Sequence, residues 1–300
     1  MSERLFTIIN PAAGGGRCGK LAGSALERLR SSGIELEIAQ TTRPGHAIEL
    51  TRAAQARGYN NFLAVGGDGT AFEIVNGLFP CDASRPRPSL GFLPLGTGNS
   101  FLKDFTSRGA EHAMEALLAG RRRPCDVLRL THSSGELYFI NLLTLGFAAD
   151  VAALTNRRFK RLGELGYIFG VLACLARLNR RAFPLRVDHQ TDLDQRRCLF
   201  LAFSNSKFTG GKMMIAPNAD PTDGLIEYVR WGPISRLGLI RNFSTLFTGT
   251  HIYHPLASRA SARRIDFELE GPVEVTLDGD SMRLDCKSVE VLPSALDVLA

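Results

Sequence analysis

NFLAVGGDGTAFE, residues 61–73, is the stretch of sequence that decides the fold. Its run Phe62-Leu63-Ala64-Val65 is short and apolar, as a buried strand should be, and glycines follow it at once. Thr70 and Glu73 have the T-x-x-E spacing of a capping box, so we expect a helix that begins directly after the glycines. A strand, a glycine turn and a helix form the unit from which parallel sheets are built.

The same pattern of strand and helix recurs on both sides of this stretch. Strand-like runs occupy residues 5–10, 34–38 and 89–93, and helical periods occupy 20–32, 47–57 and 71–78. Repeated units of this kind predict a parallel sheet with helices on its faces. We therefore expect an α/β N-terminal domain over residues 1–125. The C-terminal segment 293–300 is a candidate for an additional part of this domain.

The second half of the chain has a different pattern. From about Asp126 onward, many short strand-like runs are separated by turns such as Asp223-Gly224 and Asp278-Gly279. Such runs are typical of an antiparallel β-sandwich or a barrel. The prediction is a mainly antiparallel β-sandwich domain over residues 126–292. Two helical stretches are expected to interrupt it, at about 156–181 and 233–248.

Three glycine-rich loops follow strands of the predicted parallel sheet. They are Asn10-Pro11-Ala12-Ala13-Gly14-Gly15-Gly16-Arg17, Gly66-Gly67-Asp68-Gly69-Thr70 and Pro94-Leu95-Gly96-Thr97-Gly98-Asn99-Ser100. Ligands bind such sheets at the carboxyl ends of the strands. Glycine lets the backbone approach a ligand, and the amides at the start of the next helix bind phosphate oxygens. None of the loops matches the Walker pattern or the Rossmann spacing.

Asp68 is the acid of the second loop. At the start of a helix, its carboxylate is expected to stay ionised among backbone N–H donors and to bind Mg²⁺ or a metal-bound water. The alternative is a tight turn with an aspartate cap. One loop of this kind fits either interpretation, whereas three at strand ends in one domain favour a nucleotide–metal site.

Charge and composition narrow the function further. A net charge of +6 and a pI of about 9.2 favour anionic partners: a nucleotide, an anionic lipid surface or nucleic acid. No interleaved aromatic and basic residues mark a nucleic-acid module, so nucleic acid is not expected. The first residues lack the pattern of a signal peptide, and the apolar run Leu165 to Ala176 is shorter than the ~20 residues of a membrane span. Six cysteines without CxxC spacing indicate a reduced, cytoplasmic protein.

With its loops in this order, the chain resembles the diacylglycerol kinase catalytic family, which includes bacterial lipid kinases, sphingosine kinases and ceramide kinases. The GGDGT motif of residues 66–70 is shared with the NAD kinases, so the specificity comes from later landmarks that cover nearly the whole chain. They are Thr41 before Gly45-His46-Ala47, Gly210-Gly211, Ala216-Pro217-Asn218-Ala219 with Asp223-Gly224, and Asp278-Gly279-Asp280.

The resemblance implies a kinase that uses ATP and Mg²⁺ to phosphorylate a hydroxyl of diacylglycerol or a related lipid. Asp68 would lie close to the phosphates and the Mg²⁺. An acid of the Asp278-Gly279-Asp280 turn would be the general base, and the sequence does not separate Asp278 from Asp280. The implied ATP-binding positions are Asn10, Pro11, Ala12, Ala13, Gly14, Thr41, Gly66, Gly67, Asp68, Gly69, Thr70, Glu73, Gly96, Thr97 and Asn99.

The resemblance also implies a structural Mg²⁺ loop, in which the Asp223 side chain and the carbonyls near Asp220 and Leu225 would be ligands. Its oxygen-rich chemistry suits a hard cation. Asp126 matches an acid that the family links to its catalytic aspartates through water and metal. Some positions differ from the family pattern and would alter the rate or the metal dependence. Phe72 stands where Asn is frequent, Ser100 replaces an acid, Gly15 replaces a Lys of some members with Arg17 nearby, and Asp280 replaces a frequent Glu.

A lipid kinase has to reach its acceptor at a bilayer, so the expected location is cytoplasmic and peripheral, at the inner face of the membrane. Basic residues flank the apolar run of residues 165–176 and would suit an anionic surface. They are Arg157, Arg158, Lys160, Arg161, Arg177, Arg180 and Arg181. A packed helix with solvated ends is the alternative interpretation of this segment.

Two other functions stay open at this point. An NAD kinase shares the glycine loop, although Phe72 replaces its nucleoside-contacting Asn and its T-P-T-G-S-T-A-Y-like segment is absent. A catalytically weak regulator that binds nucleotide or lipid would keep the same fold, and the changes at Phe72 and Ser100 would fit it. The sequence identifies neither the acceptor lipid nor the oligomeric state, and a homodimer stays open.

Overall fold

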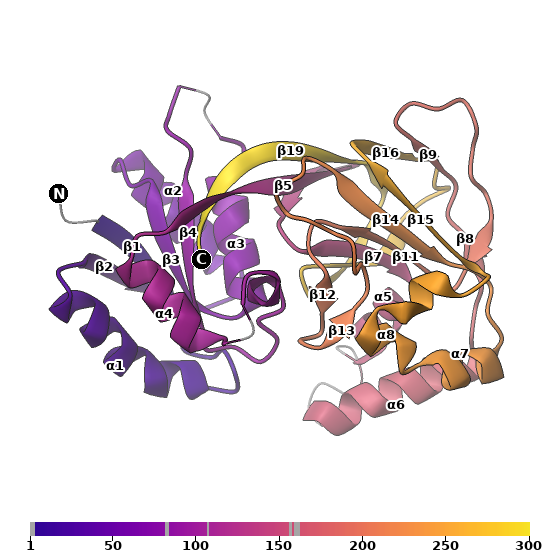
Figure 1. Cartoon of the computed structure of the whole chain (residues 1–300), viewed down its shortest axis with the longest axis horizontal. Coiled ribbons are helices and arrows are strands. Elements are labelled where there is room, and N and C mark those ends of the chain that lie inside the picture. Colours follow the sequence, from indigo (N-terminus) through magenta and orange to yellow (C-terminus); the bar gives the residue numbers. More distant parts are fainter. Residues whose placement is uncertain (1–3, 82–83, 107, 156–157, 159–162) are drawn as a thin grey trace. The chain divides into compact units, whose positions relative to one another are not determined.

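In the computed structural model, which describes residues 4–81, 84–106, 108–155, 158 and 163–300 and only the backbone of 163–168, the first part of the chain forms a parallel sheet. Its strands are β1 (Arg4–Ile9), β2 (Glu35–Gln40), β3 (Asn61–Gly66) and β4 (Ser89–Pro94). They lie in the order β2-β1-β3-β4 and all run in one direction (Figure 1). The carboxyl ends of these strands therefore lie along one edge of the sheet.

Helices follow the strands, as the apolar periodicity predicts. They are α1 (Arg17–Ser31), α2 (His46–Ala56), α3 (Asp68–Leu78), the short 3₁₀ turn η1 (Phe101–Asp104) and α4 (Ala110–Leu118). In α1 the buried residues are Cys18, Ala22, Leu26 and Leu29, spaced three or four apart so that they share one face. That face packs on apolar side chains of β1 and β3, which forms a hydrophobic core.

The long strand β19 (Cys286–Leu299) ends in this sheet, where its residues 297–299 pair in parallel with β4. By its internal contacts the chain divides into two compact units, Met1–Val127 with Leu292–Ala300 and Leu128–Val291. The C-terminal segment therefore belongs to the first unit. The sequence pattern shows only residues 288–292 as a strand run, because the alternation of the later residues is interrupted by Pro293.

The second unit is mainly antiparallel. One sheet has the order β15-β14-β11-β7-β17-β18 and every pair in it is antiparallel. Its strands are β7 (Leu142–Gly146), β11 (Phe200–Ser204), β14 (Ile226–Trp231), β15 (Ala257–Ala262), β17 (Val273–Leu277) and β18 (Asp280–Leu284). The prediction of an α/β domain followed by an antiparallel β domain is confirmed.

Shorter pairings complete the unit. β16 (Arg264–Phe267) pairs with β19 and with β9 (Leu185–Val187), and β5 (Arg122–His132) pairs with β19 and β6 (Gly135–Phe139). Two small ribbons join β8 (Arg181–Ala182) to β10 (Arg197–Cys198), and β12 (Phe208–Thr209) to β13 (Met213–Met214).

The helices of the second unit differ in detail from the sequence expectation. They are α5 (Phe147–Leu154), α6 (Gly163–Ala176), α7 (Arg236–Asn242), α8 (Thr245–Thr248) and the 3₁₀ turn η4 (Thr250–Tyr253). The helix expected to reach Arg181 ends at Ala176, because Arg181 already pairs with Cys198 in a β ribbon. The helix expected over 233–248 is divided at Phe243 and Ser244, and α5 was not predicted.

Candidate active site

The second and third glycine loops touch each other backbone to backbone. They follow β3 and β4, which are neighbours in the sheet, and the Gly96 amide donates to the Gly66 carbonyl at 2.7 Å. A Cβ atom on Gly96 would lie only 2.4 Å from the Cα of Gly67. This approach excludes every other residue type at position 96 without movement of the backbone.

The first loop, after β1, is joined to both of the others. Asn10 donates from Nδ2 to the Thr70 hydroxyl at 3.3 Å, and Arg17 donates from Nη2 to the Gly96 carbonyl at 2.9 Å. Gly14 has φ +62°, and a Cβ there would lie 2.8 Å from the Leu95 carbonyl oxygen. The three loops that the sequence predicts as a phosphate site therefore form one continuous group.

Asp68 is the first residue of α3 and is held by the third loop. Its Oδ2 accepts from the Ser100 amide at 2.8 Å and its Oδ1 from the Phe101 amide at 3.5 Å. Burial raises the pKa of this carboxyl above its ordinary value, against the opposing effect of the Ser100 and Phe101 amides and of the Lys103 charge. Desolvation thus acts against the charged form of Asp68, and the backbone donors around it act in its favour.

A cation beside Asp68 would favour its charged form, which is the arrangement of a nucleotide–metal site. Ser100 itself is buried against this carboxylate, and its hydroxyl also lowers the pKa of Asp68. An acid at position 100 would place a second negative charge there. The serine avoids that repulsion.

The capping box predicted for α3 is wrong. Glu73 instead accepts from the Gly45 amide at 2.8 Å and the Ala47 amide at 3.0 Å, so it caps the N-terminus of the neighbouring helix α2. Thr70 is buried inside α3, where its hydroxyl accepts from Asn10. Glu73 thereby holds the loop that follows β2, in which the Thr41 amide donates to the Ile9 carbonyl at 2.9 Å.

The remaining predicted nucleotide positions lie in the same loops. Thr97 is exposed in the third loop, and Asn99, with φ +48°, donates to the carbonyls of Pro94 and Gly96 at 3.2 and 3.0 Å. Phe72 is buried in the core of the unit. Its position explains why an apolar side chain is tolerated there, and it removes one polar contact that an Asn would offer.

The two acids of the Asp278-Gly279-Asp280 turn, between β17 and β18, have opposite environments. Asp278 is buried with φ +45°, and its carboxylate accepts from the amides of Ile140, Asn141 and Leu142, each at 3.0 Å. Asp280 is exposed. A carboxylate that holds three backbone amides fixes the turn, whereas an exposed one can exchange a proton.

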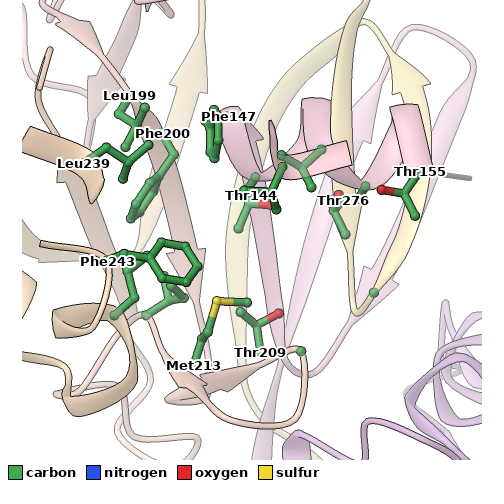
Figure 2. Close-up of a pocket in the computed structure, with 18 residues that line it drawn as sticks. Thr144, Phe147, Thr155, Leu199, Phe200, Thr209, Met213, Leu239, Phe243 and Thr276 are labelled. Atoms are coloured by element: carbon green, nitrogen blue, oxygen red, sulfur yellow. The ribbon is translucent and has the colours of Figure 1, made fainter. Parts of the chain in front are cut away.

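An apolar cavity of about 280 Å³ lies beside this turn, within the second unit. Figure 2 shows Phe200 and Phe243 on one side of it, Thr144 and Thr276 on the other, and Met213 below. The other lining residues are Phe147, Ala148, Val151, Ala152, Thr155, Val171, Leu199, Thr209, Gly210, Ile215, Leu239, Leu246 and Gly279. Sequence reasoning missed this cavity, because its walls come from segments that are far apart in the chain.

Comparison with known proteins agrees with this arrangement. Residues 4–130 match the model of the diacylglycerol kinase catalytic domain, and residues 141–300 match that of the YegS C-terminal NAD kinase beta sandwich-like domain. A relative from Chromohalobacter salexigens named "Probable lipid kinase YegS-like" is 30% identical over 288 residues, which cover 92% of this chain and 87% of the relative.

The chain belongs to the family of diacylglycerol kinases and YegS-like lipid kinases.

Other relatives of this family span nearly the same length. The diacylglycerol kinase of Mycobacterium tuberculosis is 29% identical over 299 residues, with 99% of this chain and 94% of the relative covered. A crystal structure of a diacylglycerol kinase from Bacillus anthracis has the same fold, with a TM-score of 0.71 and 20% identity over 99% of this chain and 96% of that one. Membership in a kinase family implies ATP as a ligand and, usually, a divalent metal ion.

The sequence also predicts metal-binding roles for Asp220 and Asp223 and for Asp126. Asp220 accepts at Oδ1 from the amide and the hydroxyl of Thr222, and Asp223 accepts from the Leu225 amide at 2.9 Å. In the part of the chain that the structure describes, no three His, Cys, Asp or Glu side chains are grouped as for a metal ion. An ion in the 220–225 loop would therefore need backbone carbonyls as well, which is the ligand set that the resemblance implies.

Asp126 is fully buried in β5, where it accepts from the Ser294 amide of β19 at 2.6 Å. It therefore ties the C-terminal strand into the first unit. Among the described helices, none has the length and the apolar character that crossing a bilayer requires.

Proposed function

We propose that this chain is an ATP-dependent lipid kinase that transfers the γ-phosphoryl group to a hydroxyl of diacylglycerol or a related lipid. The observation that carries the proposal is the apolar cavity of about 280 Å³ that Gly279 helps to line, between Asp278 and Asp280. A kinase for a small polar acceptor needs no apolar cavity of this size. A lipid acceptor would place an acyl chain there and present its hydroxyl beside an acid.

ATP would bind at the three glycine loops of the first unit. Their backbone amides would hold the phosphates, at the carboxyl ends of neighbouring parallel strands. Arg17, whose guanidinium joins the first and third loops, would add a positive charge near these phosphates. Glu73 would act indirectly, since it positions the loop that carries Thr41.

Asp68 would be the protein ligand for Mg²⁺, directly or through water. Mg²⁺ is usually held by one or two carboxylates together with substrate phosphates and water, and a single buried acid beside a phosphate site fits that pattern. The ion would neutralise charge on the phosphates. The 220–225 loop would hold a second, structural Mg²⁺ through the Asp223 side chain and the carbonyls near Asp220 and Leu225. Asp126 would support the first unit near its C-terminal strand.

Asp280 would be the general base and Asp278 the residue that holds the turn. The lipid hydroxyl would give its proton to the Asp280 carboxylate while its oxygen forms the new bond to the γ-phosphorus. The bond from that phosphorus to the β–γ bridging oxygen breaks, and ADP leaves. Asp278 is unsuited to accept the proton, because three backbone amides already occupy its oxygens.

The direct test is the transfer of labelled phosphate from ATP and Mg²⁺ to a panel of lipids in mixed micelles, with NAD in the same panel. The expected result is a labelled lipid that is lost in Asp68→Ala and kept in Asp192→Asn, a control acid on the surface of the second unit. Labelled NADP would show that the chain is an NAD kinase instead. ATP binding without any labelled product would show a regulator that lacks kinase activity.

A further inference from the structure

Helices α6, α7 and α8 of the second unit pack against one another around the cavity (Figure 1). Arg236, the first residue of α7, donates to the carbonyls of Leu175 and Ala176 at the C-terminus of α6, at 3.0 and 2.7 Å. The Phe243 and Phe247 rings contact each other at 5.8 Å between centroids and join α8 to the end of α7. These contacts make the three helices one surface element.

Each of these helices turns an apolar side chain inward to the cavity. Val171 does so from α6, Leu239 from α7 and Leu246 from α8. The same helices also carry large apolar side chains that are exposed, which we call the apolar face. Its members and their exposed fractions are Phe169 (49%), Leu172 (55%), Leu237 (55%), Ile240 (58%) and Phe247 (44%). A helix that is apolar on two sides requires a second apolar environment.

The charge along the apolar face is mostly positive. Apart from Glu164 in the first turn of α6, residues 163–187 and 228–265 contain no Asp or Glu, while Arg177, Arg236 and Arg241 are exposed on or next to the three helices. Only some of the basic residues that flank residues 165–176 in the sequence contribute to this charge. Arg180 donates to the Ile234 carbonyl and Arg181 pairs with Asp150, so both are engaged within the protein, and Arg157, Lys160 and Arg161 lie outside the described residues.

We propose that the apolar face docks on an anionic lipid bilayer, with Phe169, Leu172, Leu237, Ile240 and Phe247 among the acyl chains and the arginines at the phosphate level. Apolar side chains with a cationic border are the pattern of helices that lie in the membrane interface. The cavity lies directly behind these helices, so an acyl chain would pass from bilayer to cavity without entering water. An anionic bilayer offers both an apolar interior and negatively charged headgroups, whereas a protein partner would need an apolar surface with acidic residues around it.

The reason for docking rests on the proposed function, because a lipid kinase needs access to its acceptor. Binding to vesicles, however, is measured without catalysis. The experiment is flotation of the full chain with phosphatidylcholine vesicles that either contain or lack phosphatidylglycerol. The variant is the triple change Phe169→Gln, Leu237→Gln and Ile240→Gln, which alters only exposed side chains. The matched control is Leu21→Gln on α1 of the first unit, since Leu21 is similarly exposed at 45%.

The expected result is binding of the parent chain that requires phosphatidylglycerol, falls by at least about tenfold in the triple variant and is unchanged in Leu21→Gln. Arg241→Gln should weaken binding about fivefold, by loss of one interfacial charge. Activity on lipid in detergent micelles should survive the triple change, while activity on vesicles should fall with binding.

Three results would overturn the proposal. One is vesicle binding that the triple variant keeps. Another is a parent chain that phosphorylates lipid in micelles but binds no vesicle. The third is a parent chain that sediments as a dimer and becomes monomeric in the triple variant without binding vesicles. A chain that binds vesicles through this face but phosphorylates no lipid would refute the proposed function and leave the docking surface standing.

Discussion

The glycine loops of the first unit and the apolar cavity of the second unit differ in the atoms that shape them. The loops are defined by backbone: the Gly96 amide donates to the Gly66 carbonyl, and a Cβ on Gly96 would lie 2.4 Å from the Gly67 Cα. The cavity is defined by side chains from β7, α5, β11, α6, α7, α8 and β17. Under the proposed function, phosphate would be bound by amides in fixed short loops, whereas an acyl chain would be bound by the shape of a packed interior.

The largest expected effect separates the two acids at the turn beside the cavity. Asp280→Asn should lower kcat by about 10²–10⁴, because the acceptor hydroxyl loses its base, while the affinity for ATP stays unchanged. Steady-state transfer to lipid together with ATP titration measures both. A kcat within a few-fold of the parent would mean that another group takes the proton.

Asp278→Ala should act on stability instead. Its loss leaves the buried amides of Ile140, Asn141 and Leu142 without their acceptor, which should cost at least about 3 kcal/mol of unfolding free energy. Urea unfolding measures this, with Asp280→Ala as the comparison, expected within about 0.5 kcal/mol of the parent. Equal stability of the two variants would contradict the assignment of Asp278 as the structural acid of the turn.

Gly96→Ala tests the backbone contact of the loops. A Cβ there would lie 2.4 Å from the Gly67 Cα, and forcing the two loops apart should cost about 1–3 kcal/mol and weaken ATP binding by at least about tenfold. Calorimetric titration with ATP gives the affinity. Gly23→Ala is the matched control, because nothing lies within 4 Å of its added Cβ in α1, and it should stabilise the helix by about 0.5–1 kcal/mol.

Ala152→Phe tests the cavity in the same manner. The phenylalanine ring would occupy part of the cavity of about 280 Å³. It should therefore raise KM for long-chain acceptors by about tenfold, while the affinity for ATP and the KM for short-chain acceptors stay unchanged. The measurement is a KM series over acyl-chain length. An equal rise for all chain lengths would mean that the acyl chain binds elsewhere.

The smallest expected effect concerns pH. His251 is buried against Phe200 and Trp231, and burial lowers its pKa below the ordinary value despite carbonyl contacts from Ile215 and Thr245. The unfolded chain therefore takes up the proton first, so the stability due to neutral His251 is present above about pH 6.5 and is lost as pH falls toward the lowered pKa. Urea midpoints at about pH 8 and about pH 5 should differ less in His251→Phe than in the parent. An equal difference between the two midpoints in the parent and in His251→Phe would mean that His251 does not cause the pH dependence of stability.

The contrast between the two regions also explains what the sequence could predict. The βα units and the glycine loops follow from local patterns, because Phe62 to Thr70 contains its own strand, turn and helix start. Glu73 was misplaced because a T-x-x-E spacing looks the same whether the acid caps its own helix or, as here, the helix beside it.

Long-range packing accounts for the rest. Asp278 and Asp280 have the same local sequence context, and only burial separates them. The cavity joins residues from Thr144 to Gly279, and its apolar residues are indistinguishable in sequence from ordinary core. The exposed members of the apolar face are equally hidden, since Ile240 and its buried neighbour Leu239 differ only in the direction that each side chain takes.

The most direct test of the central claim compares acceptors that share a hydroxyl and differ only in their acyl chains. Labelled phosphate transfer from ATP to glycerol, to short-chain diacylglycerol and to long-chain diacylglycerol would be measured with the parent chain in mixed micelles. The expected result is that kcat/KM rises with chain length as acyl groups enter the cavity, and that Asp280→Asn lowers transfer to each acceptor by about 10²–10⁴. Transfer to glycerol as efficient as transfer to long-chain diacylglycerol would contradict it.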